Sequence, residues 1–346
     1  MRQHLRLFRT ALISVTLSLF SLACSAQAQK LEPLRMVYSS NTPGSDSTFL
    51  FAGKQLGFFK DEGIDLQIDL AAGNTAAMAV LAAGRADVSI GGPEPIVNYA
   101  SKGVGMKSIY VYAHQTIWGL GFLKSSKIQK ITDLKGARVG VLSLGSGAVP
   151  ALQYSLREAG MKLDDVKMVP IGTGASAVVA VKSGEVDALM FYDTAWPMFA
   201  QNGIEVNLYE IPKLQTNYPG NVFVARDDTI QEKRALIQRF VRAAHKSLIY
   251  STRNPTGATK AFSQEYPEVI KNLPLEEVIW KQRAKILVLP ESAKGVWGSS
   301  NDAGWEKAVD MMFLAGLITT KPAVSKLYTN EFLKEANAMD LSKLPK

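Results

Sequence analysis

The sequence predicts an α/β protein made of two similar α/β lobes joined by two crossing strands. Two stretches, 76–88 and 176–188, share one pattern: small apolar residues, a Gly, and an Asp ahead of a short apolar strand. Strands alternate with helices along most of the chain, which favours parallel sheets built from βαβ units. No low-complexity linker divides the chain. We therefore expect short crossing segments between the lobes, with a cleft as the working part.

Each copy of the repeat has the local signals of a helix followed by a strand. A polar residue before the apolar run can cap the N-terminus of the helix. Gly84 and Gly184 then stand where the helix must end, and Gly tolerates the left-handed conformation of that position. Asp87 and Asp187 lead into the strands. Two such units at matching places indicate two lobes of similar construction.

Apolar and alternating runs predict the order of the other elements. The first half has expected strands at 34–39, 64–70, 87–90 and 107–113, with a helix over 48–55. The second half has expected strands at 118–123, 138–142, 166–171, 187–191 and 206–211, and 221–225 is the return crossing. Helices dominate after Asp227, including an amphipathic one over 229–251. We expect these last helices to pack onto the first lobe.

The first 28 residues have the pattern of a cleavable export signal: a basic start, an apolar stretch, and Ala26-Gln27-Ala28 with small residues at the cleavage positions. We expect cleavage after Ala28 and an extracytoplasmic location. Lobe 1 is then 29–115 with 222–346, and lobe 2 is 116–221. Lipid anchoring at Cys24 is the alternative, although Ser21 stands where a lipobox usually has Leu.

Composition excludes several classes of function. The formal charge of +8 includes three arginines of the predicted signal, and the remaining basic residues are scattered among acidic ones. This pattern does not predict a nucleic-acid surface. Cys24 is the only cysteine, and the two later histidines, His114 and His245, have no partner at metal-ligand spacing. We expect no metal, no catalytic triad and no cofactor. The stretch 142–147 lacks the third Gly of a dinucleotide-binding loop, where Pro150 stands instead.

The polar loops that follow the predicted strands supply the candidate ligand-binding residues, because ligands of open α/β sheets bind beyond the carboxyl ends of the strands. In the first lobe these are Ser39, Asn41, Asn74, Thr75, Gly92 and Glu94, and in the second they are Ser143, Ser146, Gly147, Thr173, Gly174 and Asp193. Several lie at helix starts, where unpaired N–H groups favour an anion or a carbonyl oxygen.

Aromatic side chains near the same loop ends can enclose a ring. Tyr38, Trp118 and Tyr192 are so placed, and His114 ends a strand at the first crossing, within reach of the cleft. Glu94 and Asp193 argue against a purely anionic ligand, because carboxylates accept hydrogen bonds from amines, amidines or hydroxyls. The alternative is that each acidic residue only complements the dipole of its own helix.

Two motifs carry a resemblance to a known family. The stretch Gly57-Phe58-Phe59-Lys60-Asp61-Glu62-Gly63-Ile64-Asp65-Leu66 resembles the G-[YF]-F-x-x-E-G-[IL]-x-[VL] motif of periplasmic substrate-binding proteins of the sulfonate, nitrate and thiamine-precursor type. Residues 133–140, Asp-Leu-Lys-Gly-Ala-Arg-Val-Gly, are similar to that family's opening of its second lobe. The two Gly-x-x-Asp units fit as well, so the resemblance spans about residues 33–320.

The resemblance implies a two-lobed type II periplasmic-binding-protein fold in a monomer that delivers a solute to an ABC permease and its ATPase. A small organic sulfonate or carboxylate is the first ligand class expected, and an aminopyrimidine or thiamine-precursor heterocycle is the alternative. Nitrate is less well matched, since it needs no aromatic walls. The broad family also includes a pyrimidine synthase, an enzyme whose cysteine cluster has no counterpart here. A further alternative is a receptor that presents its solute to a sensor domain and takes no part in transport.

Overall fold

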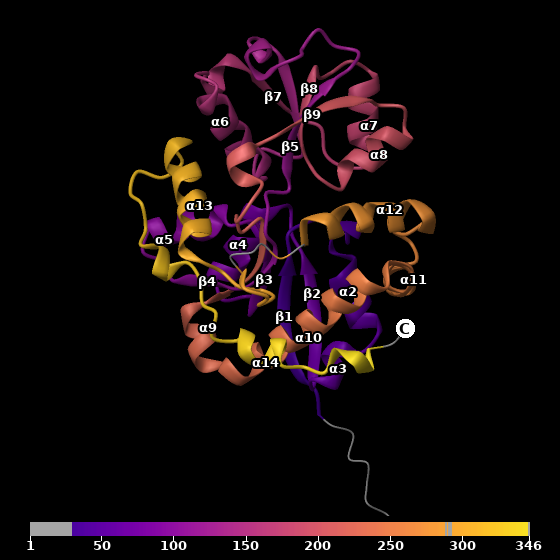
Figure 1. Cartoon of the computed structure of the whole chain (residues 1–346), viewed down its shortest axis with the longest axis vertical. Coiled ribbons are helices and arrows are strands. Elements are labelled where there is room, and N and C mark those ends of the chain that lie inside the picture. The colour runs from indigo at the N-terminus through magenta and orange to yellow at the C-terminus, as the bar shows by residue number, and fades with distance from the viewer. Residues whose placement is uncertain (1–29, 288, 290–292, 345–346) are drawn as a thin grey trace, which may run out of the picture. The chain divides into compact units, whose positions relative to one another are not determined.

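The computed structural model describes residues 30–287, 289 and 293–344. The predicted signal peptide and Cys24 lie outside these residues. The fold is built on two five-stranded sheets, with strand orders β2-β1-β3-β10-β4 and β7-β6-β8-β5-β9 (Figure 1). The first sheet contains β1 (Glu32–Tyr38), β2 (Ile64–Leu70), β3 (Val88–Gly91), β4 (Met106–Ala113) and β10 (Asn221–Arg226). The second contains β5 (Trp118–Leu123), β6 (Arg138–Val141), β7 (Lys167–Pro170), β8 (Ala188–Tyr192) and β9 (Val206–Glu210).

The two sheets have the same construction. In each, three neighbouring strands are parallel: β2, β1 and β3 in the first sheet, and β7, β6 and β8 in the second. An antiparallel strand follows, β10 or β5, and in each case it has entered from the other sheet. A mixed sheet of this kind has its parallel carboxyl ends on one edge, where the following loops gather.

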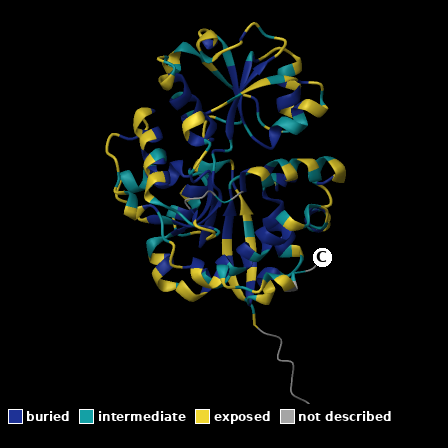
Figure 2. Cartoon of the chain, viewed as in Figure 1, coloured by how far each residue is buried: buried dark blue, intermediate teal, exposed yellow. Residues whose placement is uncertain are grey.

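Helices connect the strands and cover both sheets. Those within the repeating part are α2 (Thr48–Gln55), α3 (Phe58–Asp61), α4 (Asn74–Ala82), α5 (Glu94–Ser101), α6 (Ala148–Glu158), α7 (Ala175–Lys182) and α8 (Ala195–Gln201). The later ones are α9 (Asp227–Glu232), α10 (Arg234–Arg253), α11 (Pro255–Glu265), α12 (Leu273–Ala284), α13 (Asp302–Leu314) and α14 (Leu333–Asn337). Figure 2 shows buried residues along the strands and exposed ones along the outer helix faces.

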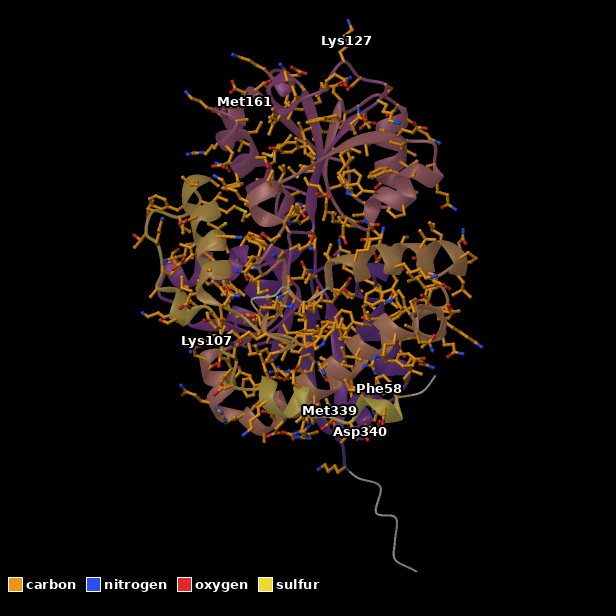
Figure 3. The ribbon with its side chains drawn as sticks, in the orientation of Figure 1. Phe58, Lys107, Lys127, Met161, Met339 and Asp340 are labelled. Carbon is orange, nitrogen blue, oxygen red and sulfur yellow. The ribbon has the colours of Figure 1, made fainter. Side chains whose placement is uncertain are left out.

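The core of the first sheet is strongly aromatic. Phe49 of α2 packs against Trp280 of α12 and Phe223 of β10, and all three side chains are fully buried. Phe58 of α3 packs edge-to-face on Tyr250, which lies near the C-terminal end of α10. Phe58 is labelled in Figure 3. Burial of large rings stabilises this sheet and fixes the helices that contact it.

Two expectations for the C-terminal part need correction. The predicted helix over 229–251 is two helices, because the chain bends at Lys233 (φ −117°, ψ 30°) between α9 and α10. The last helices do not pack on the first sheet alone: α12 also contacts α8, and α13 contacts α6. Two of these helices therefore touch elements of both sheets.

The crossings between the sheets are short irregular segments, 114–117 and 211–220, and they are hydrogen-bonded to each other. Thr116 N–H donates to Leu214 O at 2.9 Å, and Tyr218 N–H donates to His114 O at 3.0 Å. β10 begins at Asn221, one residue before the lobe boundary proposed from the sequence. Among the described residues, no helix is both long and apolar enough to span a bilayer.

Candidate ligand-binding site

A cavity of about 360 Å³ is lined by loops that leave both sheets. From the first sheet, Tyr38 is the last residue of β1, Asn74 is the first of α4, and Glu94 is the first of α5. These positions follow the carboxyl ends of parallel strands, as expected for an α/β sheet. The volume is within the range of small-molecule sites.

The second sheet lines the cavity in the same way. Ser143, Ser146 and Gly147 lie between β6 and α6, and Thr173 lies between β7 and α7. Trp118, the first residue of β5, pairs with Tyr192, the last residue of β8. Their ring centroids are 6.3 Å apart with an interplanar angle of 83°. An edge-to-face pair of this kind holds both rings in place.

The structure brings most of the candidate residues to this cavity. Those that line it are Tyr38, Ser39, Asn41, Asn74, Gly92, Glu94, Trp118, Ser143, Ser146, Gly147, Thr173 and Tyr192. Thr75, His114, Gly174 and Asp193 do not. For the residues that line the cavity, only the position is established, and their contact with a ligand stays a prediction.

The remaining four have other neighbours. Thr75 Oγ1 donates to Gly145 O at 2.8 Å, which joins α4 to the loop after β6. His114 lies in the first crossing and is buried, and burial lowers its pKa to about 4. Gly174 is the N-cap of α7 and has φ +59°. Asp193 lies against Arg283.

The wall also contains charged or polar residues that were not predicted from the sequence, among them Asp46, Asn221 and Arg283. Asp46 lies in the 3-10 helix 45–47, and Asn221 begins β10. Arg283 is in the last turn of α12, where a basic residue normally complements the helix C-terminus in solvent. Nothing in its local sequence distinguishes it from the exposed Lys281.

Arg283 is fully buried at the cavity wall and forms an ion pair with Asp193. Its Nη2 atom is 2.8 Å from Asp193 Oδ1 and 4.0 Å from Asp46 Oδ2. Tyr38 holds Asp46 in turn, because its hydroxyl donates to Oδ1 at 3.1 Å. Burial raises the pKa of Asp193 to about 6, and the neighbouring Arg283 opposes this rise. Arg283 thus has two acidic neighbours.

Glu94 carries the most strongly perturbed carboxyl group of the cavity wall among the described residues. Burial raises its pKa to about 7, opposed by a backbone hydrogen bond of Glu94 itself and by the hydroxyl of Tyr218, which is 3.5 Å from Oε1. Its other oxygen, Oε2, has no hydrogen-bond partner in the described part of the chain. A buried carboxyl oxygen without a donor is costly. Glu94 is therefore suited to a donor that a ligand brings.

A close approach of backbone to side chain explains the glycine at position 92. A Cβ atom there would lie 2.3 Å from Glu94 Oε2 and 3.3 Å from Asn74 Nδ2. Any larger residue would displace the carboxyl group. Gly92 consequently leaves room for both polar side chains at this end of the cavity.

Several buried polar atoms of the wall have no aligned hydrogen-bond partner among the described residues. The acceptors are Glu94 Oε2, Asn74 Oδ1 and Asn221 Oδ1, and the donors are Arg283 Nε, Nη1 and Nη2. Arg283 Nη2 is close to Asp193, but the contact lacks hydrogen-bond alignment. Because buried polar groups are normally paired, these atoms mark where a bound molecule would supply complementary groups. The described residues include no group of three or more His, Cys, Asp or Glu able to hold a metal.

Comparisons with known proteins match this fold. The formylaminopyrimidine-binding protein of Halalkalibacterium halodurans is 22% identical over 280 residues, which cover 78% of this chain and 82% of that protein. The 4-amino-5-hydroxymethyl-2-methylpyrimidine phosphate synthase of Legionella pneumophila is 23% identical over 298 residues, covering 85% of this chain and 90% of that protein.

A solved structure has the same two-lobed arrangement. The alkanesulfonate-binding protein SsuA from Xanthomonas axonopodis pv. citri, bound to MOPS, superposes with a TM-score of 0.66 at 17% identity. The match covers 86% of this chain and 98% of SsuA. This chain therefore has the two-lobed fold of periplasmic binding proteins. The model of the NMT1/THI5 like family matches residues 44–258. The chain belongs to the NMT1/THI5 like family.

Proposed function

We propose that this chain is an extracytoplasmic solute-binding protein that captures a small, flat nitrogen heterocycle, such as an aminopyrimidine, and delivers it to an ABC importer. The observation that carries the proposal is Glu94: a buried carboxyl group at the cavity wall with one oxygen that lacks a donor. An amino group beside a ring nitrogen matches a carboxyl group through two parallel hydrogen bonds. The match holds whichever partner carries the shared proton.

Neighbouring acceptors support a ligand rich in N–H donors. Asn74 Oδ1 and Asn221 Oδ1 are also buried at the wall without a partner among the described residues. Asn221 Nδ2 already donates to the hydroxyl of Tyr112 at 2.6 Å, which fixes the amide so that its oxygen is left for another donor. A ring with two or more N–H groups would pair with these acceptors.

The aromatic walls support a planar ligand. Tyr38 lines the cavity from the first sheet, and Trp118 and Tyr192 line it from the second. Rings of this kind bury a flat heterocycle over most of its surface and so supply affinity, while the polar atoms supply selectivity. This combination favours the heterocycle over nitrate, which has no face to bury.

An organic sulfonate or carboxylate is the second candidate, and Arg283 is the observation that favours it. Its Nε and Nη1 donors have no partner among the described residues, and guanidinium groups recognise sulfonate-like anions well. Against it stands the charge of the wall. Asp46 and Asp193 already offset the charge of Arg283, so the wall offers an anion little net attraction.

Capture follows from the two-lobed fold. A solute that contacts loops of both sheets has its highest affinity for the closed state and therefore shifts the population toward closure. The closed protein would dock on a permease whose ATPase supplies the work. Binding proteins among the relatives support a role without catalysis, and the predicted signal supports a periplasmic location. We propose that this chain is not an enzyme and works as a monomer.

The test is ligand binding to the protein purified from the periplasm of an expression host. Aminopyrimidines, alkyl and aromatic sulfonates, aromatic carboxylates and nitrate are compared by thermal shift, and hits are measured by calorimetry. At a hundred times its Kd, a ligand adds about 2.7 kcal/mol, a shift of several degrees. We expect aminopyrimidines to raise Tm and sulfonates to leave it unchanged.

Two variants separate the ligand classes. Glu94→Gln should weaken aminopyrimidine binding at least tenfold, whereas Glu205→Gln, an exposed glutamate that pairs with Lys124, should not change it. A sulfonate hit that Glu94→Gln leaves intact and Arg283→Gln abolishes would support the second candidate and overturn the first. No shift with any compound would count against both ligand classes.

A further inference from the structure

We propose that Asp193 is a positioning residue that couples closure of the two lobes to ligand capture, by holding Arg283 at the cavity wall. The inference rests on the proposed binding function. Asp193 does not line the cavity, but Arg283 does. Any effect of Asp193 on affinity must therefore act through Arg283 or through closure.

The two partners come from different sheets. Asp193 follows β8 of the second sheet, and its backbone N–H donates to Ile117 O at 2.8 Å. Arg283 is in α12, which packs against the 3-10 helix 45–47. That short helix in turn contacts α2, so α12 belongs to the side of the first sheet. α12 also contacts α8, which begins two residues after Asp193 (Figure 1). The pair thus bridges the two halves where α12 and α8 meet.

The ion pair between Asp193 and Arg283 is energetically important because both side chains are buried. Arg283 has no exposed surface and the Asp193 side chain is 10% exposed, at an Nη2 to Oδ1 distance of 2.8 Å. A buried charge that loses its partner is strongly destabilised, unlike a charge in water. When the lobes open, water must replace each partner. The closed state keeps the pair, so its loss should shift the population toward the open state.

Two hydrogen bonds that join the lobes among the described residues are weaker candidates for this coupling. Thr75 Oγ1 donates to Gly145 O at 2.8 Å, but this hydrogen bond is exposed. Gln153 Nε2 donates to Ala315 O between α6 and the end of α13. Both are neutral, and neutral hydrogen bonds exchange with water at little net cost. The ion pair is the contact whose removal should change closure most.

Closure is measured first, without ligand, on the processed protein. Spin labels at Lys60→Cys and Lys127→Cys report the distance between the two halves by dipolar spectroscopy, since both lysines are exposed, one beside each sheet. We expect Asp193→Asn to move the distance distribution toward the open state. With the ligand found above, it should raise the dissociation rate at least tenfold and leave the association rate nearly unchanged.

Matched variants make the result specific. Asp187→Asn removes a 2.7 Å ion pair with Arg138 that lies within the second sheet, so it should lower Tm without changing the label distance or the dissociation rate. Asp193→Glu keeps the charge and should restore part of the closed population. Circular dichroism checks that each variant is folded.

Each outcome decides one question. Equal label distances in folded Asp193→Asn and the parent protein would overturn the coupling, whether or not a ligand is known. Recovery by Asp193→Glu would support it. If the distances change but no compound binds, the closing contact stands and the proposed ligand class fails. Because the first measurement uses no ligand, the two failures are distinguishable.

Discussion

Asp87 and Asp187, one in each copy of the internal repeat, make the same contact with the neighbouring strand of their own sheet. Asp87 Oδ2 accepts from Arg35 N–H at 2.9 Å, and Asp187 Oδ2 accepts from Arg138 N–H at 2.8 Å. Each aspartate N–H also donates to the carbonyl oxygen of the same arginine at 2.8 Å. The repeat seen in the sequence therefore fixes how the strand after each helix joins its sheet.

The two aspartates differ in burial, and this difference predicts unequal effects on stability. The Asp87 side chain is 4% exposed and is 2.8 Å from Lys233 Nζ, whereas that of Asp187 is 33% exposed. We expect Asp87→Asn to lower the free energy of unfolding by about 2–3 kcal/mol and Asp187→Asn by about 1 kcal/mol. Urea unfolding at pH 7 measures both. Equal losses would contradict the role assigned to burial.

Acid should remove the advantage of Asp87. Burial alone would raise its pKa, but the hydrogen bonds from Lys233 and Arg35 outweigh burial and lower the pKa below the ordinary 3.8. The stabilisation is therefore present above pH 3.8 and is lost as the pH falls through the lower folded value. Parent protein and Asp87→Asn should converge in stability in strong acid. A constant difference down to that pH would contradict the ion pairs as its source.

Glu94 predicts the opposite pH dependence. Its folded pKa of about 7 exceeds the ordinary 4.5 because of burial, so the protonated form is favoured in the folded protein. Stability from this group is complete below pH 4.5 and is lost as the pH rises through 7, by an amount on the order of 3 kcal/mol. Glu94→Gln should be progressively more stable than the parent protein over this window.

Thermal unfolding of the ligand-free protein at half-unit steps from pH 4.5 to 8 measures the effect. Other titrating groups, including His114 and Asp193, are common to both proteins, so the difference between the two curves isolates Glu94. A difference in Tm that is independent of pH would mean that the carboxyl group is not desolvated. Such a result would weaken the ligand assignment as well.

Much of the fold could be predicted because its signals are local. The helix over 48–55 and the strands over 64–70 and 118–123 have the bounds expected from apolar pattern and flanking glycines. The break at Lys233 could not be predicted, because the sequence around it is compatible with one helix. There the side chain of Lys233 reaches Asp87, an ion pair that only the tertiary structure defines.

The candidate site also contains residues that the sequence predicts and residues that only the tertiary structure reveals. Loops after strands were found by a rule of sheet topology that needs only the order of elements, and so Asn74, Glu94 and Tyr192 were expected at the cavity. Arg283 was missed because its burial depends on contacts with Asp46 and Asp193, far away in the chain. Asp193 was expected to bind the ligand; it pairs with Arg283 and does not itself line the cavity, so its effect on a ligand stays a prediction.

Gly92→Ala should weaken binding with little loss of fold. The added Cβ would lie 2.3 Å from Glu94 Oε2, so the carboxyl group must leave its position beside Asn74. We expect at least a tenfold rise in Kd for an aminopyrimidine. Gly105→Ala is the matched control, because its Cβ would lie 2.4 Å from Asp227 Oδ2, a carboxyl group that is not part of the cavity wall. Equal losses of affinity in both variants would contradict the placement of Glu94.

Trp118 should report ligand binding by its fluorescence and contribute to affinity through its ring. It lines the cavity beside Tyr192, whereas Trp280 and Trp305 are fully buried elsewhere in the core. A ligand ring against this indole would change its emission, and Trp118→Phe should abolish most of that change while binding persists. Trp118→Leu should cost about 1 kcal/mol, roughly fivefold in Kd. Trp196→Phe is the control: this indole packs on Phe199 and does not line the cavity, so the fluorescence change should remain. If the change instead survives in Trp118→Phe and disappears in Trp196→Phe, the ligand does not occupy the cavity described above.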